Sequence, residues 1–497
     1  MRLVFLFILI YFCVPVSLAQ NFKQGQSYEA QKGFHPLNIP GIIGEELLLL
    51  RISNDSKTGF EKSFILDRFD TSSLNFKGSW SPELPLSGMK APVREACLIW
   101  NNKLCVFYSD FLKEKRQYRL VYYVIDAEGN AGSERELLQL PAAGFNIGSP
   151  RFDLSISENG KWLSVFYHSL PARNANTEIS VARFDSLYQQ TGLTQAQIGF
   201  EPGNLRVEQS ITDNDGNLHV LLSNEKDSLQ RFSLFAFPVF GNEILEYPLE
   251  IPGKEIETVR IALGKIDKLF VAGFFRESFG EKSKSAGVFF ILTDRESGRV
   301  DASSIKLFQT DLKALNAGDI ELNKENLRNL KSFGLFPGPD NRALLIADSR
   351  SLSIKCEIDY RNGLEVCHDL FASGNLICVS FDARGEPAWY RLIDNAQESV
   401  DDGGRYLGFA SYEGKSGSVR LLRNVQPPAN HKLKEDSYRR AVPVNGILNS
   451  NGQFEESNAN FELPFPAYTG IVFKEKSGKV YFLSGFSDSF QLNLIRN

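Results

Sequence analysis

Two cysteines have the spacing that most directly predicts a covalent bond. Cys356 and Cys367 stand on either side of residues 360–363, which could form the turn of a hairpin. If that turn forms, the two strands place the cysteines opposite each other, and a disulfide is geometrically possible. Two half-buried thiols are the alternative.

The other cysteines give no predicted bond. Five cysteines follow the first twenty residues, an odd number, so at least one is free or paired between chains. Cys97 and Cys105 flank Asn101 and Asn102, and a two-residue turn at these asparagines points the two thiols to opposite faces of a sheet. Cys378 lies in an apolar run, where we expect a small core residue.

The histidines form no metal-binding motif. No two are four residues apart and no HExxH occurs; the five are His35, His168, His219, His368 and His431. Residues 213–217 begin like a calcium loop, but the twelfth position is Asn224, where an EF-hand loop needs a bidentate glutamate. We expect a hairpin turn there, with no metal site and no cofactor.

Motifs that mark common catalytic sites are also missing. No G-x-S-x-G elbow, phosphate-binding loop or dinucleotide fingerprint stands where a strand and a helix would hold it. No catalytic residue is therefore predicted. Paired carboxylates stay open, because 60 Asp and Glu residues are enough to bring some acids close together.

The elements that must position these side chains are strands in a repeat. A strand, a tight turn of Asn, Asp or Gly and a second strand with alternating apolar residues recur along the chain. The predicted second strands are residues 47–53, 103–109, 162–168, 217–223, 268–274, 343–349, 418–424 and 479–485. A third strand, which tends to end in aspartate, follows most of them, as at Asp70, Asp126, Asp185, Asp294 and Asp382.

Four antiparallel strands repeated at this period predict an all-β fold, a single β-propeller of four-stranded blades at residues 41–497. We count eight copies, and seven blades with one copy used elsewhere is the alternative. The chain ends after only a third strand, so we expect the N-terminal segment 20–40 to supply the missing outer strand and close the ring. Inserts are predicted near residues 309–331, 352–371 and 425–440.

The first residues are predicted to be a targeting sequence. Residues 1–19 have a positive start, an apolar run and small residues before a cleavage site after Ala19, as in a secretory signal peptide. The apolar run is shorter than the roughly 20 residues that span a bilayer, although a retained anchor is the alternative. We expect an exported protein, periplasmic or extracellular, with no membrane span after cleavage.

The charge excludes one class of partner. Lys and Arg number 55 against 60 Asp and Glu, whereas a nucleic-acid binder is normally clearly basic. Basic residues nevertheless recur in the loops after the second strands, where they could form an anion-attracting rim; solvated loops with interspersed acids are the alternative. The basic residues are Lys113, Lys115, Arg116, Arg119, Arg173, Lys226, Arg231, Arg276, Lys282 and Lys284.

Short segments resemble known repeats. Residues 155–169 resemble the turn and strand of TolB-type propeller repeats, and residues 212–223 resemble an NHL-type repeat. More broadly, residues 255–497 resemble exported propeller-like proteins of Bacteroidota-type bacteria, on the segments 268–300 and 381–404. The resemblance implies export and a propeller fold, and it supplies no activity.

These patterns favour a non-enzymatic binding module that presents propeller loops to a protein or glycan ligand. The regular scaffold, the polar inserts and the lack of a catalytic motif support this hypothesis. A carbohydrate-active hydrolase or lyase that uses carboxylates at the channel is the alternative, and a structural component of an envelope complex is a third possibility. A propeller supports both binding and catalysis, so the fold does not decide between them.

Overall fold

A computed structural model gives the architecture of the chain. It describes residues 21–53, 63–86, 89, 92–141, 151–168, 177–200, 205–226, 229–239, 244–265, 267–277, 285–320, 327, 329–359, 364–425, 441–456 and 463–496. Within these ranges almost every regular element is a strand. None of the helical segments described there has the length and apolar character needed to cross a bilayer.

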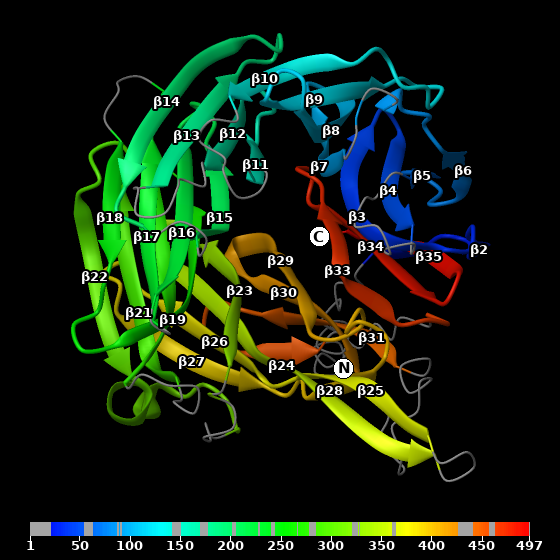
Figure 1. Ribbon diagram of the computed structural model, residues 1–497. Coiled ribbons are helices and arrows are strands. Elements are labelled where there is room, and N and C mark those ends of the chain that lie inside the picture. Colours follow the sequence, from blue (N-terminus) through cyan, green and yellow to red (C-terminus); the bar gives the residue numbers. More distant parts are fainter. Residues whose placement is uncertain are drawn as a thin grey trace, which may run out of the picture.

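The strands form eight antiparallel sheets over the described residues (Figure 1). The first four sheets follow the chain in order: β3 (Phe34–Ile43), β4 (Glu46–Ser53), β5 (Phe64–Asp70) and β6 (Phe76–Trp80); β7 (Val93–Trp100), β8 (Lys103–Leu112), β9 (Gln117–Ile125) and β10 (Arg135–Pro141); β11 (Arg151–Ile156), β12 (Leu163–His168), β13 (Thr177–Phe184) and β14 (Gln190–Ile198); β15 (Leu205–Thr212), β16 (Leu218–Lys226), β17 (Leu229–Phe237) and β18 (Leu245–Leu249).

The other four sheets include two with additional strands. They hold β19 (Glu255–Leu263), β20 (Lys268–Arg276), β21 (Ser285–Asp294) and β22 (Val300–Leu307); β23 (Leu330–Pro337), β24 (Ala343–Asp359), β26 (Leu376–Phe381) and β27 (Pro387–Ile393), extended by β25 (Leu364–Ser373) and β28 (Gln397–Val400); β29 (Phe409–Glu413), β30 (Val419–Val425), β31 (Val442–Leu448) and β32 (Phe454–Glu456); β33 (Ala467–Lys474), β34 (Lys479–Phe486), β35 (Ser489–Arg496), β1 (Asn21–Gln24) and β2 (Tyr28–Glu29).

The sheets close into a ring. The first strand of each sheet contacts the first strands of both neighbouring sheets, from β3 through β33 and back to β3, so these eight strands surround the axis. All eight predicted second strands fall in β4, β8, β12, β16, β20, β24, β30 and β34. The prediction of an all-β propeller is confirmed, and the described sheets match the count of eight copies.

The apolar core is divided among the junctions of the ring. Eight buried clusters lie one between each pair of neighbouring sheets. Because side chains alternate between the two faces of a strand, each sheet contributes to two clusters. Cys97 and Cys105 show this directly, since they lie in different clusters on opposite faces of the second sheet, as expected. Cys378 lies in the core between the sixth and seventh sheets.

The N-terminal segment completes the eighth sheet. β1 pairs with β35, with Asn21 opposite Arg496, and β2 pairs with the same strand further along. The closing segment is shorter than predicted, because residues 34–40 belong to β3. This strand is the one in the first sheet that lies nearest the axis of the ring. A β-bulge near Pro36 lets this proline sit in the strand, since a bulge removes the need for a ladder N–H.

A buried ion pair fastens this closure. Arg51 on β4 and Asp67 on β5 are fully buried, with Nε and Oδ2 2.6 Å apart. Tyr28 of the closing segment donates its hydroxyl to the same carboxylate (2.6 Å), and Arg51 also donates to the carbonyl of Gln31 (3.0 Å). Burial raises the pKa of Tyr28, which keeps its hydroxyl protonated as a donor. These hydrogen bonds join the first sheet to the closing segment, and strand pairing joins that segment to the last sheet.

Strand order divides the propeller into two faces. The turns between first and second strands and between third and fourth strands lie on one face, named here the turn face. The aspartates predicted at the ends of third strands accept hydrogen bonds there from backbone N–H groups of the following turns. These hydrogen bonds hold the pKa of Asp294 down to about 2. The connections between second and third strands lie on the opposite face, the loop face.

Two of the three predicted inserts fall largely within the described residues, one between the fifth and sixth sheets and one within the sixth sheet. Residues 309–331 include the short helical segments η4 (Phe308–Leu312) and η5 (Lys313–Leu315), which pack beside β22 and β27. Within the second predicted insert, residues 352–359 of β24 pair with residues 364–371 of β25, between the second and third strands of the sixth sheet. Residues 426–440, in the third predicted insert, lie outside the described part of the chain. Single-turn helices η6 (Pro339–Asn341) and η7 (Lys415–Gly417) complete the elements.

Candidate functional site

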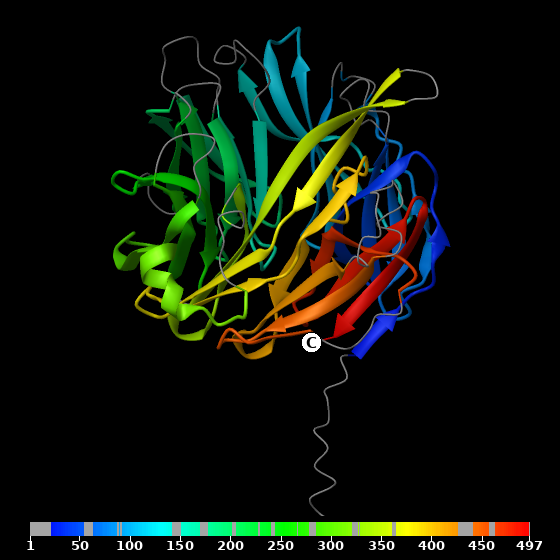
Figure 2. The ribbon, with the colours of Figure 1, turned by 90° about the horizontal axis from the view of Figure 1, so that it is seen from below.

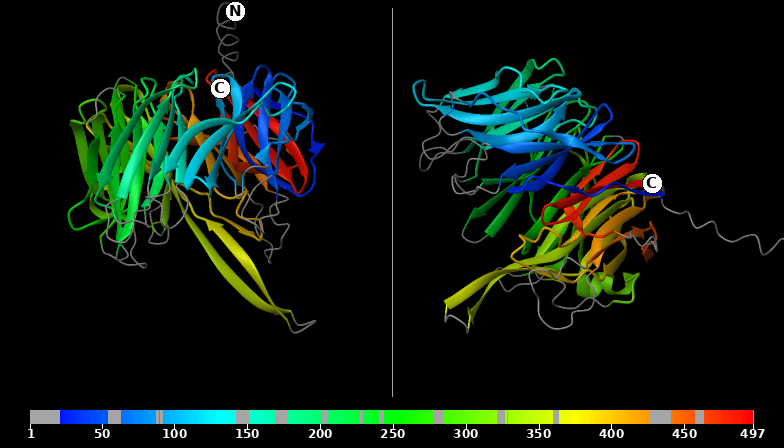
Figure 3. Two further views of the ribbon diagram at one scale, coloured as in Figure 1. Left: turned by 45° about the horizontal axis from the view of Figure 1, so that its top comes forward. Right: turned by 90° about the vertical axis from the view of Figure 1, so that its right-hand side faces the viewer.

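A single hairpin leaves the ring on the loop face. β24 runs for 17 residues, and only its first part, up to Ser349, pairs with β23 in the sixth sheet. From Arg350 onward it pairs with β25 alone, as far as Asp359 opposite Leu364. Figure 3 shows the two strands extending well beyond the other described loops, and Figure 2 shows them in yellow, running obliquely to the strands of the ring. We name the two paired strands of this hairpin, residues 350–359 and 364–373, the arm.

The base of the arm is anchored by buried polar groups. Asp348 has no exposed surface and accepts hydrogen bonds from the Ser373 hydroxyl (3.0 Å) and from Nε of Arg350 (3.3 Å). Burial raises the pKa of this carboxyl to about 6. Gly408 packs against the Arg350 guanidinium so closely that a Cβ at that position would lie 2.1 Å from it. These contacts hold the two strands of the arm together at its base.

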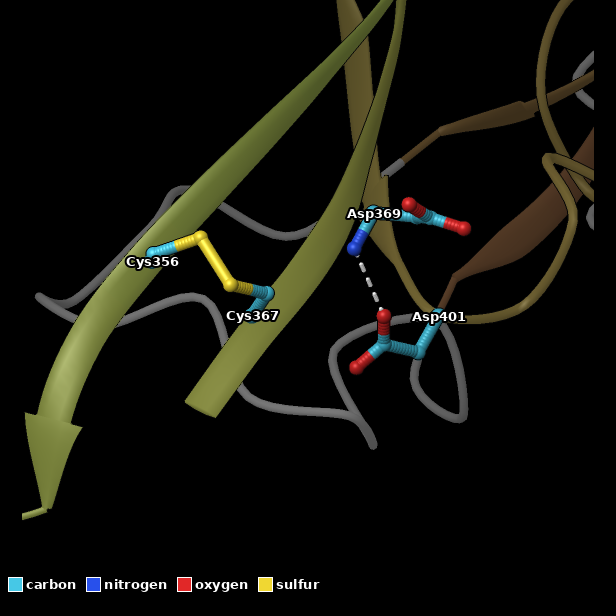
Figure 4. The surroundings of a disulfide bond; sticks show 4 residues. All are labelled: Cys356, Cys367, Asp369 and Asp401. Atoms are coloured by element: carbon cyan, nitrogen blue, oxygen red, sulfur yellow. Dashed lines mark hydrogen bonds between the residues drawn. A yellow bond between two sulfur atoms is a disulfide. The ribbon is translucent and has the colours of Figure 1, made fainter. Parts of the chain in front are cut away.

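A disulfide fastens the distal half of the arm. Cys356 and Cys367 are direct partners in the β24–β25 ladder, in the register that a turn at 360–363 requires, and the structure bonds their sulfur atoms (Figure 4). Three other cysteines of the described chain are free and buried: Cys97, Cys105 and Cys378. Burial raises the pKa of each of these thiols to about 12, so none is set up as a nucleophile.

Exposed apolar residues of β24 share one face of the arm with two acids of β25, because Asp369 pairs with Ile354 and Glu365 with Ile358. Leu352, Ile354 and Ile358 share a face with the disulfide, because their positions alternate along β24, and they are 61%, 68% and 60% exposed. Val366 is exposed on the other face. The described chain has twelve exposed large apolar side chains, and four of them are in this one hairpin. Such clustering marks an interaction surface, whereas scattered exposed apolar residues do not.

The two edges of the arm are covered over different lengths, and no described strand pairs with the outer edge of β25 over Leu364–Asp369. β28 pairs with β25 at Leu370–Ser373, and the Asp401 carboxylate then accepts the next N–H, that of Asp369 (2.8 Å; Figure 4). On the other side, the last described backbone hydrogen bond along the edge of β24 is donated by the Arg350 N–H to the carbonyl of Asn329. Beyond that point no described strand pairs with this edge of β24. An apolar strand with an open edge is a template for a further strand.

Acidic groups border the covered edge. Glu365 and Asp369 on β25 are exposed, and Asp401 lies beside them. Asp401 also contacts Nδ1 of His368 at 2.5 Å. The hydrogen bond with His368 and the Asp369 N–H hold the pKa of Asp401 below its usual value. Charged residues are thus present on both strands, since β24 also carries Lys355, Glu357 and Asp359 beside its apolar residues.

The channel-facing strands carry a second set of polar groups that the sequence did not single out. Glu95, Glu208 and Glu257 lie on β7, β15 and β19, each at a β-bulge where the register skips one residue. Each carboxylate accepts a hydrogen bond from a serine hydroxyl of the same sheet, from Ser109, Ser223 and Ser285 respectively.

Asp153 on β11 gives the intervening sheet a carboxylate as well, and it accepts a hydrogen bond from Ser210. Burial raises the pKa of Asp153, and it raises the pKa of Glu95 to about 7. Four successive sheets therefore place a carboxyl group on the strand nearest the axis. The same arrangement of a carboxyl group that accepts a serine hydroxyl is thus repeated around this part of the channel. Aligning the repeats would have revealed these acids, since each precedes a predicted second strand.

The predicted basic rim is partly neutralised. Arg119 pairs with Glu134 and lies 3.8 Å from Asp110, and Arg276 lies 2.6 Å from Glu257. The tip residues of the β8–β9 loop are exposed, with Glu114 among the three bases. Arg231 lines a groove of about 520 Å³ together with Lys254 and Glu255. Three other residues of the predicted rim lie outside the described residues, namely Arg173, Lys282 and Lys284. The side chain of Lys226 is also outside the described part of the structure.

The candidate metal residues are placed apart. Residues 213–217 form the turn between β15 and β16, where Asp213 accepts the N–H groups of Asp215 and Asn217 and pairs with Arg295 at 3.2 Å. Among the described residues, the one group of three side chains with metal-ligand spacing is Cys356, Glu365 and Cys367. Two of its members are joined in the disulfide, which removes their thiolates. His431 lies outside the described residues.

The comparisons with known proteins give no family. No family model matches the chain, and no curated protein matches it. Among solved structures, the Dos1 propeller aligns over 95% of both chains with 10% identity and a TM-score of 0.47. The WD40 domain of SCAP from fission yeast aligns over 96% of this chain and 98% of its own, with 11% identity and a TM-score of 0.35.

An enzyme is among the structural neighbours as well. A europium-containing methanol dehydrogenase aligns over 94% of this chain and 85% of its own, with 10% identity and a TM-score of 0.41. Identities this low and TM-scores below 0.5 transfer no activity to this chain. Function therefore has to be argued from the arm and the channel.

Proposed function

We propose that this protein is an exported, non-enzymatic binding module that presents its arm to a protein partner. The observation that carries the proposal is the row of exposed apolar residues on β24, in a disulfide-bonded hairpin whose β24 edge is paired with no described strand beyond Ser349. Burying an exposed Leu or Ile side chain contributes roughly 1.5–3 kcal/mol. The three residues Leu352, Ile354 and Ile358 therefore offer a partner a substantial part of a binding free energy.

A protein ligand fits this surface better than a glycan. The large apolar side chains exposed among the described residues are all Leu, Ile or Val. They supply no exposed aromatic ring on which a sugar could stack. An open strand edge, by contrast, offers backbone N–H and C=O groups that another polypeptide strand can pair with. The chemistry of the arm is thus that of strand addition.

Export is part of the same proposal. Residues 1–19 have the pattern of a signal peptide and lie outside the described residues. A disulfide on an exposed arm is stable in an oxidising compartment, such as the periplasm or the cell exterior, and is rare in the cytosol. The resemblance of residues 255–497 to exported propeller-like proteins of Bacteroidota-type bacteria supports the same location, and the single segments that resemble TolB-type and NHL-type repeats fit the propeller.

Site-specific crosslinking tests the proposal. A photo-crosslinking residue is placed at Ile354 in the full chain, in the cells that normally express it. The matched control is Leu187, which is 70% exposed on the turn face. We expect a protein adduct from position 354 that is absent from position 187 and is lost when Ile358→Asp is added. The same adducts from both positions would refute a binding role for the arm.

A carbohydrate-active hydrolase is the second candidate, because one channel carboxyl has the pKa of a general acid. Burial raises the pKa of Glu95 to about 7, so this group can donate a proton near neutral pH. Purified protein is screened against polysaccharides and reporter glycosides, and Glu95→Gln is compared with Glu208→Gln, the same bulge two sheets away. Turnover that only Glu95→Gln abolishes would replace the binding proposal.

A further inference from the structure

The open edge of β24 has backbone groups directed away from β25. The Cα atoms of Cys356 and Cys367 are 4.0 Å apart, which corresponds to the closer spacing of an antiparallel pair that exchanges no backbone hydrogen bonds. The N–H and C=O of Cys356 therefore point to the open edge. Those of Ile354 and Ile358 do the same, because the pattern alternates every two residues.

The sequence along this edge is complementary to itself. Residues 354–358 are Ile-Lys-Cys-Glu-Ile. When a second copy of the strand is laid antiparallel beside the first, with Cys356 opposite Cys356, Ile354 falls opposite Ile358. In the same register, position 355 falls opposite position 357, which pairs a lysine with a glutamate. Paired β-branched residues and opposite charges are both favourable across antiparallel strands.

We propose that the arm is a self-association site, at which two copies of this chain pair through the open edges of β24 about a two-fold axis at Cys356. The product is a continuous four-stranded sheet in which the two β24 strands are central and the two β25 strands are outermost. This inference rests on the proposed function, because it names the protein that the arm binds. The interface is isologous, so it closes after two copies and forms no filament.

The surroundings of the edge favour a second copy. The exposed acids Glu365 and Asp369 are on β25, so they lie on the outer strands of the four-stranded sheet and do not face each other. The apolar residues Leu352, Ile354 and Ile358 of both copies form one shared stripe on the central strands. The arm also projects away from the ring (Figure 3).

The size of the interface limits its strength. Stable protein–protein interfaces bury roughly 1,200–2,000 Å² in total, and a pair of short strands buries less than that. A dissociation constant on the order of 10 µM is therefore expected for the purified chain. Association then becomes strong where the local concentration is high, as on a surface or in a narrow compartment.

Sedimentation velocity on the mature protein, over about 1 to 200 µM, tests the inference. We expect a monomer–dimer equilibrium that Ile354→Asp weakens by more than about 100-fold, because it places carboxylates against the apolar stripe. Leu187→Asp, an exposed position on the turn face, serves as the control and is expected to leave the equilibrium unchanged.

A charge-swap series tests the register itself. Lys355→Glu and Glu357→Lys each place like charges opposite each other in the dimer, and each alone weakens association by about tenfold. The double variant restores it, and a mixture of the two single variants forms heterodimers more readily than either forms homodimers. If the double variant associates even more weakly than either single variant, the proposed register is wrong. A wild-type chain that stays monomeric at 200 µM would overturn self-association.

The outcomes separate this inference from the proposed function. If the chain is monomeric but position 354 still crosslinks to another protein in cells, the arm binds a different partner and only the self-association proposal fails. If the adduct formed at position 354 is a dimer of this chain, both proposals stand. If neither association nor a specific adduct is found, both fail.

Discussion

The ring and the arm use apolar residues in opposite ways. In the ring, Leu, Phe and Val alternate along each strand and fill eight clusters between neighbouring sheets. In the arm, the same alternation along β24 leaves Leu352, Ile354 and Ile358 in contact with solvent. The difference shows that a strand pattern alone does not decide burial. What decides it is whether a second sheet lies against the strand.

The largest expected effect comes from removing a ring side chain. Phe290 on β21 is fully buried and stacks on Phe381 of the next sheet, with ring centroids 4.8 Å apart. Phe290→Ala is expected to lower the free energy of unfolding by about 3–5 kcal/mol, through lost burial and a cavity. Urea unfolding followed by fluorescence measures this. Ile354→Ala is the comparison, and an equal loss from that variant would contradict the division between ring and arm.

Removing the disulfide is expected to loosen the arm and leave the ring intact. The bond closes a short loop, for which the loss of unfolded-state entropy corresponds to about 3 kcal/mol. In the double variant Cys356→Ser/Cys367→Ser, amide hydrogens of residues 364–369 are expected to exchange faster, while those of β20 and β21 keep their rates. Hydrogen-exchange mass spectrometry measures both regions at once. Equal acceleration in the ring would show that the two regions unfold together.

The bonded state of these cysteines is tested separately. Thiol titration of the denatured mature chain without reductant is expected to find three free thiols, those of Cys97, Cys105 and Cys378. Five free thiols would show that the bond between Cys356 and Cys367 is absent in solution.

The junction between the two regions is expected to respond to pH. Burial raises the pKa of Asp348 from 3.8 to about 6, so the folded protein holds a proton there that the unfolded chain releases. Stability from this group is therefore present below about pH 4 and is lost as the pH rises through about 6. Asp348→Asn is expected to flatten this part of the stability curve, measured by urea unfolding between pH 4 and 7. An unchanged slope would contradict the assignment.

The smallest effect is expected on the exposed face of the arm. Leu352→Ala is expected to change the free energy of unfolding by less than about 0.5 kcal/mol, because the side chain is already in water. The same substitution is expected to weaken binding through the arm. A stability loss comparable to that of a core residue would show that Leu352 packs against another part of the chain.

The repeated strand pattern allowed the fold to be predicted from the sequence. The alternating second strands and their polar turns predicted the propeller, and the turn at 360–363 predicted the register that places Cys356 opposite Cys367. The closing role of the N-terminal segment followed from the missing fourth strand of the last sheet. Each of these depends on local pattern, which a single sequence contains.

The features that now matter most depend on distant contacts. The open edge of β24 follows from β23 ending its pairing at Ser349, which no local pattern indicates. The bulged position of Glu95 depends on a one-residue skip in the ladder with β8. The buried pair of Arg51 and Asp67 depends on Tyr28 and Gln31 of the closing segment, which only the closed ring brings near.

The most direct test is hydrogen exchange along β24 as a function of protein concentration. We predict that amides of residues 351–359 exchange more slowly at 200 µM than at 1 µM, while the ring strands exchange at the same rates at both concentrations. Exchange in residues 351–359 that is fast and independent of concentration would contradict the pairing of two arms.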